Sequence, residues 1–425
     1  MASLYADIIP KSLRFSNVDS LFFYDIIRSG DWMKKNFKLT IIAGYFGYIT
    51  QAIVNNLAPL LFLIFRDTFG ISLSKITMLI TVNFCVQLVV DYSATKFVDK
   101  IGYRAGIVGA HIFAAAGLIC LGVLPKIMED SYEGLLISVV LYALGGGLIE
   151  VLISPIVEAC PTDNKAAAMS LLHSFYCWGT VAVVAVSTLF LHFFGKNSWQ
   201  LLAVLWAVVP VLNGILFFVV PINTLTEENE GMKNRELMKS GLFWLFVLLM
   251  VTAGASEQAM SQWASAFAES GLNVSKTVGD LLGPCLFSVL MGTSRVVSAK
   301  LSKKTDVTTL MIIGGVLCVV SYLLASLTHS AVFGLVGCAL CGLSVGVMWP
   351  GAFSLASRSF KRGGTALFAL LALAGDMGCT LGPTLVGELS DGAKNGLKSG
   401  LLISIVFPIL LIVACAYLKK KEKNK

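Results

Sequence analysis

The sequence predicts an all-α membrane protein with twelve transmembrane helices, on the basis of its composition and its pattern of apolar runs. Of its 425 residues, 56% are hydrophobic and only 13% are charged, and the mean hydropathy is +0.80. Soluble domains carry about 25% charged residues, so this composition excludes a soluble enzyme. Apolar runs of about 20 residues, the length that crosses the hydrocarbon core, recur along the chain. Strands of a transmembrane barrel would instead alternate apolar and polar residues over about 10 residues.

The apolar runs and the polar breaks between them define the expected helices. One long polar segment, residues 222–240, separates the sixth run from the seventh and holds seven charged side chains. It divides the chain into an N-terminal bundle of six helices, residues 39–221, and a C-terminal bundle of six, residues 241–418. Residues 1–38 precede the first bundle, and a basic tail, residues 419–425, follows the second. The expected helices span 39–66, 74–98, 104–125, 133–159, 165–195, 199–221, 241–270, 276–301, 307–327, 331–357, 363–388 and 397–418.

Lysine and arginine are distributed unevenly between the two sets of connecting segments. The N-terminal segment, the loops that follow even-numbered helices and the tail hold 24 of the 32, whereas the opposite loops hold seven. Because cytoplasmic segments carry the excess of these residues, we expect both termini and the 222–240 linker in the cytoplasm of a multi-pass plasma-membrane protein. This topology also accounts for the net charge of +7, so no nucleic-acid partner is expected.

The first 38 residues are not expected to form a cleavable signal peptide, because charged residues interrupt their apolar stretches. The first transmembrane helix is therefore expected to anchor the chain. Within this leader, residues 20–36 form either a short helix on the membrane surface or a disordered tail.

The two halves of the chain share a pattern of glycine and proline. The fourth and fifth helices run through GGGLIEVLISPIVEACPTDNKAAAMSLLHSFYCWG, and the tenth and eleventh through GLSVGVMWPGAFSLASRSFKRGGTALFALLALAG. Gly147 pairs with Gly342, and Pro155 with Pro350, at a common offset of 195 residues. Internal repeats of this kind are typical of transporters, whose solute binds near the bilayer midplane between the repeats.

The loop between the second and third helices, TKFVDKIGYR, resembles the Gly-x-x-x-Asp-Arg-x-Gly-Arg-Arg loop of the major facilitator superfamily. The matching residues are Asp99, Lys100, Gly102 and Arg104, and the departures are Thr95 and Tyr103. The resemblance covers the chain from about residue 39, and it implies the major facilitator fold of two pseudo-symmetric six-helix bundles. We expect Asp99 and its neighbouring cations to form an ion-pair latch on the cytoplasmic side.

A finer resemblance is to the fucose-permease-like sugar:proton symporters of that superfamily. It is carried by GGGLIEVLISPIVEACP with LLHSFYCWG in the first half, and by VMWPGAFSLA with GDMGCTLGPTLVGELSD in the second. By this resemblance Glu150 corresponds to the membrane-embedded Glu of the proton-coupled sugar carriers. Ser154 stands where that group has Asn, and Asp376 is not a residue that the group implies. The Gly-Pro-Gly pattern of the eleventh helix disfavours a proton-driven drug exporter, which carries such a pattern on its fifth helix.

Three carboxyl groups within the expected helices are candidates for proton coupling: Glu150, Glu257 and Asp376. A charge at bilayer depth costs about 2.5–3.5 kcal/mol on insertion scales, so such a residue usually faces a cavity or a partner. A carboxyl in a cavity can bind a proton in one access state and release it in the other. The alternative for Glu150 is a structural hydrogen bond to Ser154 or to a neighbouring helix.

Four further charged residues are interpreted as structural or gating charges. Asp91 and Arg295 lie within helices but close to the cytoplasmic loops, and Asp99 and Arg104 belong to the loop between the second and third helices. We expect these charges to stabilise conformations rather than to contact the solute.

Amides and aromatic rings within the expected helices suit a neutral polyol, because amides exchange hydrogen bonds with hydroxyls and aromatic faces cover the apolar side of a sugar ring. Among them Asn55 and Gln262 are the strongest candidates, whereas each aromatic ring has helix packing as an alternative. The candidate substrate-binding residues are Gln51, Asn55, Asn83, Gln87, His173, Trp178, Gln258, Gln262, Trp263 and Trp349.

Together these features predict a secondary active transporter that moves a small polar solute, with a sugar as the first choice, by alternating access. The coupling ion is expected to be a proton, with sodium as the alternative, and we expect no cofactor, no metal site and no obligate protein partner. An exporter or carrier of an amphipathic or cationic compound stays open, as does a non-transporting membrane receptor. A membrane enzyme is not expected, because the sequence lacks HExxH, GxSxG and GxxxxGK[ST] motifs.

Overall fold

The computed structural model describes residues 36–161, 165–223, 232, 234–302, 305–360 and 364–423. Within these ranges the chain is helical apart from short turns, and it contains no strand there. Twelve helical spans are long and apolar enough to cross a membrane. The predicted all-α, twelve-helix class is therefore confirmed. Nearly all of the leader, part of the linker and the end of the basic tail lie outside the described residues.

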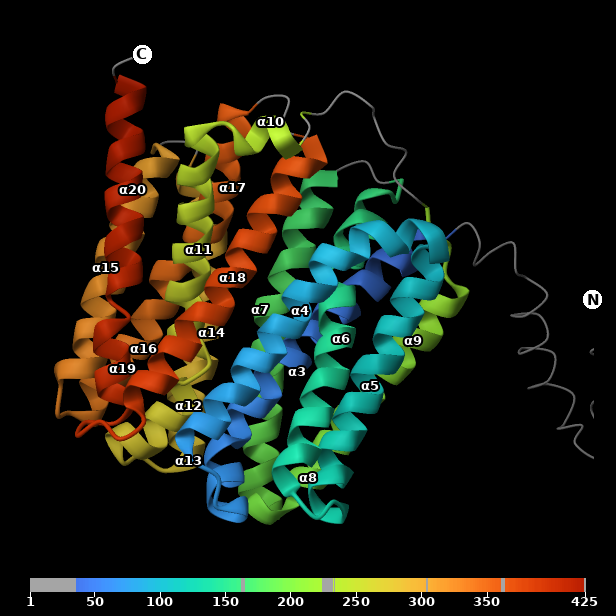
Figure 1. Ribbon diagram of the computed structural model, residues 1–425, viewed down its shortest axis with the longest axis vertical. Helices are drawn as coiled ribbons and strands as arrows, with labels where there is room; N and C mark the ends of the chain where they lie inside the picture. Colours follow the sequence, from blue (N-terminus) through green and yellow to red (C-terminus); the bar gives the residue numbers. More distant parts are fainter. Residues whose placement is uncertain are drawn as a thin grey trace, which may run out of the picture.

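The first half of the chain forms six of these spans (Figure 1). Five are single helices: α3 (Phe37–Phe69), α4 (Leu73–Ile101), α5 (Tyr103–Ile127), α6 (Ser131–Glu158) and α7 (Lys165–Phe194). The sixth consists of a 3₁₀ turn and two helices: η2 (Lys196–Ser198), α8 (Trp199–Trp206) and α9 (Val208–Val219). The short helix α10 (Asn234–Met238) belongs to the linker.

The second half forms the other six spans, and most of them are interrupted. The seventh is α11 (Gly241–Ser261), α12 (Ala264–Ala266) and the π-helical η3 (Phe267–Gly271); the eighth is α13 (Lys276–Asp280), the π-helical η4 (Leu281–Cys285) and α14 (Leu286–Leu301). The ninth and eleventh are single helices, α15 (Val307–Leu327) and α18 (Gly364–Ser390). The tenth is α16 (Ala331–Val345) with α17 (Met348–Ser359), and the twelfth is α19 (Leu397–Ile403) with α20 (Val406–Lys423).

Helix ends follow local capping chemistry. The carboxylate of Asp130 accepts a hydrogen bond from the backbone N–H of Tyr132 at 2.8 Å and starts α6, and Asp306 caps α15 in the same way through Thr309 at 3.1 Å. Gly70 ends α3 with a positive φ of 64°, a conformation that costs glycine little. These signals explain why the predicted boundaries lie close to the observed ones.

The break in the seventh span was not predicted, since residues 241–270 read as one apolar run. No glycine or proline marks the break between α11 and α12. The two residues at the break instead bond to other helices: Gln262 Nε2 donates to the backbone oxygen of Asn55 at 3.1 Å, and Trp263 Nε1 donates to that of Pro383 at 2.9 Å. Broken helices near the midplane are typical of transporter sites.

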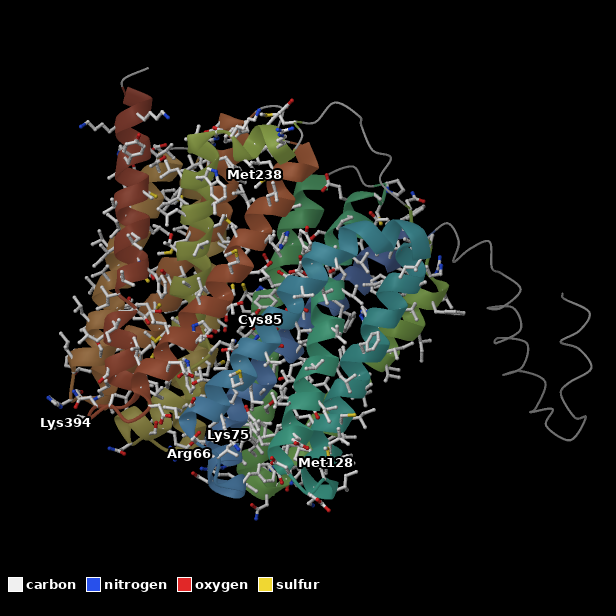
Figure 2. The ribbon with its side chains drawn as sticks, in the orientation of Figure 1. Arg66, Lys75, Cys85, Met128, Met238 and Lys394 are labelled. Carbon is white, nitrogen blue, oxygen red and sulfur yellow. The ribbon has the colours of Figure 1, made fainter. Side chains whose placement is uncertain are left out.

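The connecting segments alternate between the two ends of the molecule. Met238, within the linker, lies at the end where α20 finishes, whereas Arg66, Met128 and Lys394 lie at the opposite end; Cys85 lies between them (Figure 2). We call the end with Met238 the linker side and the opposite end the distal side. This alternation is the one that the predicted loops require.

The repeat seen in the sequence is also a repeat in packing. A Cβ atom at Gly147 of α6 would lie 3.1 Å from the Cα atom of Gln87 on α4. A Cβ atom at Gly342 of α16 would lie 2.1 Å from the backbone oxygen of Phe287 on α14. The fourth span therefore approaches the second as the tenth approaches the eighth, and small residues permit both approaches.

Replacing Gly342 by alanine is expected to destabilise the protein, because the added methyl group would force α16 away from α14. Overpacking of this kind costs about 1–3 kcal/mol. The measurement is the Tm of the purified protein in detergent, which should fall. The control is Gly109→Ala in α5, where an added Cβ meets nothing within 4 Å and alanine is the better helix former. Equal losses of Tm in both variants would contradict the packing argument.

Candidate functional site

A polar cavity of about 130 Å³ lies between the two halves. Helices α3, α4, α6 and α7 of the first half supply one part of its wall, and α11, α14, α17 and α18 of the second half supply the other. Its lining residues are Tyr48, Gln51, Asn55, Phe84, Gln87, Glu150, His173, Tyr176, Glu257, Gln258, Arg295, Trp349, Asp376 and Cys379. The cavity is the place where the candidate residues of both halves meet.

Amide side chains of the first half form a connected hydrogen-bond network in this wall. Gln51 Nε2 donates to Glu150 Oε2 at 2.9 Å and to Gln87 Oε1 at 3.0 Å. Gln87 Nε2 in turn donates to Asn55 Oδ1 at 2.9 Å and to Asn83 Oδ1 at 3.0 Å. The network joins α3, α4 and α6, and its amide N–H groups donate to oxygen acceptors within the low-dielectric interior.

Glu150 is held by a neighbouring helix and not by Ser154. The hydroxyl of Ser154 lies 3.0 Å from that of Tyr48, and the carboxylate of Glu150 accepts from Gln51. Of the two structural partners considered for Glu150, the one on its own helix is wrong and the one on a neighbouring helix is observed. This bond coexists with exposure to the cavity, since Glu150 is one of the lining residues.

The second half contributes an ion pair to the cavity. Arg295 Nη2 lies 3.9 Å from Glu257 Oε2, and both side chains are largely buried. The Nε atom of Arg295 is buried without a hydrogen-bond partner among the described residues. Arg295 is one of the residues interpreted as structural or gating charges, and the structure places it in the cavity wall. Its expected lack of contact with the solute stays a prediction.

Two rings of the cavity wall occupy defined positions. His173 meets the ring of Tyr48 edge-on, with 5.3 Å between the ring centroids. The indole of Trp349 lies against α18 at Gly375, where a Cβ atom would come within 2.2 Å of the indole carbon Cη2. Gly375 therefore gives Trp349 its place at the edge of the cavity.

Four of the ten candidate binding residues do not line the cavity. Trp178 has an exposed fraction of 51% and lies outside the cavity wall, whereas Trp263 is fully buried against Phe62 and bonds to Pro383. Asn83 and Gln262 are buried behind the lining residues and support them by hydrogen bonds. The six that line it are Gln51, Asn55, Gln87, His173, Gln258 and Trp349, and the three candidate proton-coupling residues line it as well.

The predicted gating charges have different environments. The guanidinium of Arg104 donates to the backbone oxygens of Phe217 and Phe218 at 2.9 and 2.7 Å, and so it caps α9 within its own half. Asp91 of α4 points toward Asp376 of α18. The side chain of Asp99 lies outside the described residues. The ion-pair latch expected for Asp99 and its neighbouring cations therefore stays a prediction.

A buried ion pair on the distal side was missed by the sequence analysis. Lys276 Nζ lies 3.0 Å from Asp280 Oδ2 and donates to the backbone oxygen of Leu60 in the first half at 2.6 Å. Asp280 also accepts from Thr188 of α7 at 3.1 Å and from Ser265 at 2.5 Å. The i, i+4 spacing of Lys276 and Asp280 was the available signal. The pair therefore joins the two halves below the cavity.

Further hydrogen bonds close the distal side between the halves. Ser74 donates to Glu388 at 3.3 Å, and the hydroxyls of Thr81 and Thr384 lie 2.6 Å apart, both between α4 and α18. Lys196 pairs with Glu269 at 2.5 Å in a more exposed position. These contacts hold the two halves together on the distal side in this conformation.

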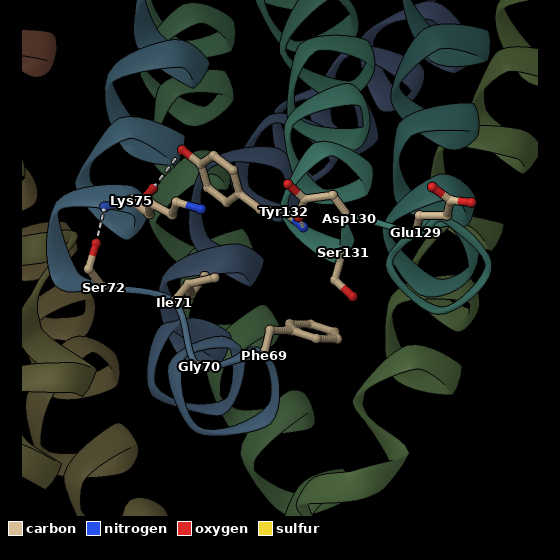
Figure 3. Close-up of a pocket in the computed structure, with 9 residues that line it drawn as sticks. All are labelled: Phe69, Gly70, Ile71, Ser72, Lys75, Glu129, Asp130, Ser131 and Tyr132. Carbon is tan, nitrogen blue, oxygen red and sulfur yellow. Dashed lines mark hydrogen bonds between the residues drawn. The ribbon is translucent and has the colours of Figure 1, made fainter.

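A larger hollow of about 440 Å³ lies at the distal end of the first half (Figure 3). The turns between α3 and α4 and between α5 and α6 form it, and Lys75 Nζ lies 4.7 Å from the ring centroid of Tyr132 there. Residues of the second half do not line it. Because a carrier needs a site that both halves share, the smaller cavity between the halves is the candidate site.

Comparison with known proteins identifies the family. A family model described as Major Facilitator Superfamily matches residues 41–383. The chain belongs to this superfamily. It is therefore a membrane transporter of small-molecule solutes and not an enzyme.

One solved major facilitator structure is similar over nearly its whole length. The E. coli fucose:proton symporter FucP, in a point variant, superposes with a TM-score of 0.64 at 15% sequence identity, and the match covers 90% of this chain and 99% of that chain. At this identity the match shows a shared fold. It confirms the resemblance to the fucose-permease-like group at that level. No curated protein sequence matches the chain significantly.

Replacing Asp280 by alanine is expected to open the distal side of this transporter, because it leaves the buried Lys276 ammonium without its partner. Breaking a buried pair in this way costs about 3–5 kcal/mol. The measurement is alkylation of the cavity residue Cys379 by a membrane-impermeant thiol reagent applied from the distal side, read by mass spectrometry. We expect a rate at least tenfold higher than in the parent.

The control for this experiment is Glu269→Gln, which breaks the exposed pair with Lys196. Exposed pairs contribute about 0–1 kcal/mol, so this variant should alkylate at nearly the parent rate. An unchanged rate in Asp280→Ala would show that the buried pair does not hold the distal side closed.

Proposed function

We propose that this protein is a proton-coupled transporter of a small neutral polar solute, with a sugar as the first choice. The observation that carries the proposal is the hydrogen bond from Gln51 to Glu150 in a cavity that both halves line. In this bond the amide of Gln51, which can also bind hydroxyl groups, donates to the ionisable carboxyl of Glu150. The fold shared with FucP, whose title names a fucose:proton symporter, supports the same assignment.

Unpartnered polar atoms on opposite walls suit a molecule that carries hydroxyl groups. Gln51 Oε1 in the first half and Arg295 Nε in the second are buried without hydrogen-bond partners among the described residues. A hydroxyl both donates and accepts, so one polyol can satisfy the amide oxygen on one side and the guanidinium N–H on the other. Such a molecule would bridge the halves, and Trp349 offers a ring face for its apolar side.

The amide of Gln51 can donate either to Glu150 or to a solute hydroxyl, and this choice suggests how binding of the proton and binding of the solute are coupled. When Glu150 is ionised, its carboxylate holds one N–H of Gln51. When Glu150 takes up a proton, its carboxyl becomes a weaker acceptor, and the Gln51 amide is free to turn toward a solute hydroxyl. Binding of the proton and binding of the solute then favour each other, which is what symport requires.

We further propose that the linker side faces the cytoplasm of the cell and that the protein resides in the plasma membrane. The excess of Lys and Arg in the loops of that side supports this orientation. Contacts between the halves hold the distal side together, so we assign this conformation to the state of the transport cycle in which the cavity is closed to the exterior. Sodium in place of the proton is the alternative coupling ion.

A second candidate solute is a small cation. Among the described residues, the cavity wall holds the carboxyls of Glu150, Glu257 and Asp376 and one cationic side chain, Arg295. If all three carboxyls stayed ionised, the cavity would favour a positively charged solute over a neutral one. The transport assay below separates these two possibilities.

Glu150→Gln is expected to abolish proton-driven accumulation of sugar, because glutamine cannot exchange a proton. Proteoliposomes are tested with labelled hexoses, deoxyhexoses and disaccharides, with and without an inward proton gradient. The parent should accumulate at least one sugar. The variant should retain only exchange between equilibrated compartments. If no sugar moves in the folded parent while a labelled organic cation does, the sugar proposal fails and the cation proposal replaces it.

Trp349→Ala is expected to raise the KM for the transported solute about fivefold, because the loss of one ring face costs about 1 kcal/mol. Trp178→Ala removes the same side chain from a position outside the cavity, and its KM should stay within twofold of the parent value. Both are measured by initial rates of uptake in proteoliposomes. Similar changes in the two variants would argue against a solute site beside Trp349.

A further inference from the structure

Helices α4 and α18 run antiparallel along the boundary between the halves, and they lie side by side in Figure 1. On the distal side their contact is neutral, through the hydroxyls of Thr81 and Thr384 at 2.6 Å. Ten residues further along α4 and eight residues back along α18, the same seam brings Asp91 and Asp376 together. One carboxyl from each half therefore meets at the level of the cavity.

The carboxyl of Asp376 is the side chain of the second half that interacts with Asp91 across this seam. Both oxygens of Asp91 are buried, and no other hydrogen-bond donor of the described residues reaches them. Asp376 has an exposed fraction of 9% and lines the cavity, whereas Asp91 does not. Two carboxylates in contact cannot both remain ionised away from water, and a hydrogen bond between them exists only when one of them carries a proton.

Among the residues that the structure describes, no cationic side chain interacts with the pair. The titratable groups that face it are Glu150 on α6, Tyr48 on α3 and Cys379 on α18. Arg295 on α14 is paired with Glu257 on α11. The histidine of the cavity, His173 on α7, faces that guanidinium.

A proton fits this site better than a metal cation does. Metal ions such as Ca²⁺ take six or more oxygen ligands, whereas the two aspartates supply four oxygens at most. Among the side chains that the structure describes, no three His, Cys, Asp or Glu residues gather as metal ligands. The group that can satisfy both carboxyls at once is a single shared proton.

We propose that Asp91 and Asp376 form a second proton site, in which one proton is shared between the two halves of the transporter. The protonated carboxyl of one donates to the carboxylate of the other, and this bond closes the seam at the level of the cavity. Asp376 exchanges the proton with cavity water. When it leaves, two buried carboxylates face each other and drive α4 away from α18. This role in the cycle rests on the proposed proton coupling, but the shared proton is testable without any solute.

The test is infrared spectroscopy of the full-length protein in lipid nanodiscs at neutral pH, without solute. The parent should show the carbonyl band of a protonated carboxyl from the pair. In Asp91→Asn or Asp376→Asn the amide donates to the remaining carboxylate, which then gives up the proton. Each single variant should therefore lose the same band, and the double variant should lose no more than either. Glu388→Gln, an exposed carboxyl on α18, should leave the band unchanged.

Other outcomes overturn the proposal. Two distinct bands, one lost in each variant and both lost in the double variant, would mean two independently protonated acids. No band lost in either variant would mean that both carboxyls are ionised. A band that disappears in sodium chloride but persists in choline chloride would mean that sodium replaces the proton. The Glu150→Gln variant should keep the band of the pair, so failure of the proposed coupling at Glu150 does not decide this test.

A second measurement serves if only one of the two aspartate variants folds. Cysteines placed at Thr81 and Thr384 report the distance across the seam, and mass spectrometry identifies the cross-linked peptide among those of the native cysteines. Cross-linking in the parent background should fall severalfold as pH rises and the pair loses its proton. It should become independent of pH with either Asp91→Asn or Asp376→Asn. A fall that persists in that background would overturn the proposal.

Discussion

The cost of burying polar groups away from water governs how this transporter is assembled. Inside a bundle in lipid, an unpaired amide or carboxylate is expensive, so each must find a partner. Within each half the helices approach through small residues, as at Gly147 and Gly342. Between the halves, hydrogen bonds such as that of Lys276 to Leu60 and that between Thr81 and Thr384 add to apolar contacts such as that of Phe62 with Trp263. Part of the boundary between the halves therefore consists of bonds that water can replace.

The kind of contact between two helices determines how easily they can separate. Separating two helices that interlock at a glycine leaves empty space or lipid-accessible gaps and loses many contacts at once. Separating a boundary of hydrogen bonds admits water, which replaces the lost partners at a net cost of about 0.5–1.5 kcal/mol for each bond. The bond of Lys276 to the backbone oxygen of Leu60 and that of Thr188 to Asp280 are contacts that water can substitute. The proposed alternating access would then proceed along these hydrogen bonds of the boundary, with each half moving as a unit.

The sequence determines the helices and the polar inventory well, because both depend on local composition. Which side of a helix faces the cavity, and which other helix it contacts, depends on residues far away in the sequence. Trp178 and Trp349 read alike as aromatic residues in apolar helices, but one faces outward and the other the cavity. Lipid and a half-apolar cavity impose similar patterns on a helix, so periodicity does not separate them. Lys276 read as a loop cation, since its partner Leu60 lies 216 residues away. The break at Gln262 likewise depends on a bond to α3 that no local signal announces.

The electrostatics of the cavity suggest why two proton sites would serve a neutral solute better than one. Four carboxyls, those of Glu150, Glu257, Asp91 and Asp376, surround a single guanidinium, which Glu257 already pairs. With Glu150 and the aspartate pair each holding a proton, most of the negative charge is removed, and the hydroxyls meet neutral groups, the Glu257–Arg295 ion pair and one shared carboxylate. Without these protons the same carboxylates repel across the boundary between the halves. The charge state that admits a polyol would then also be the one that holds α4 against α18, so occupancy and closure depend on the same protons.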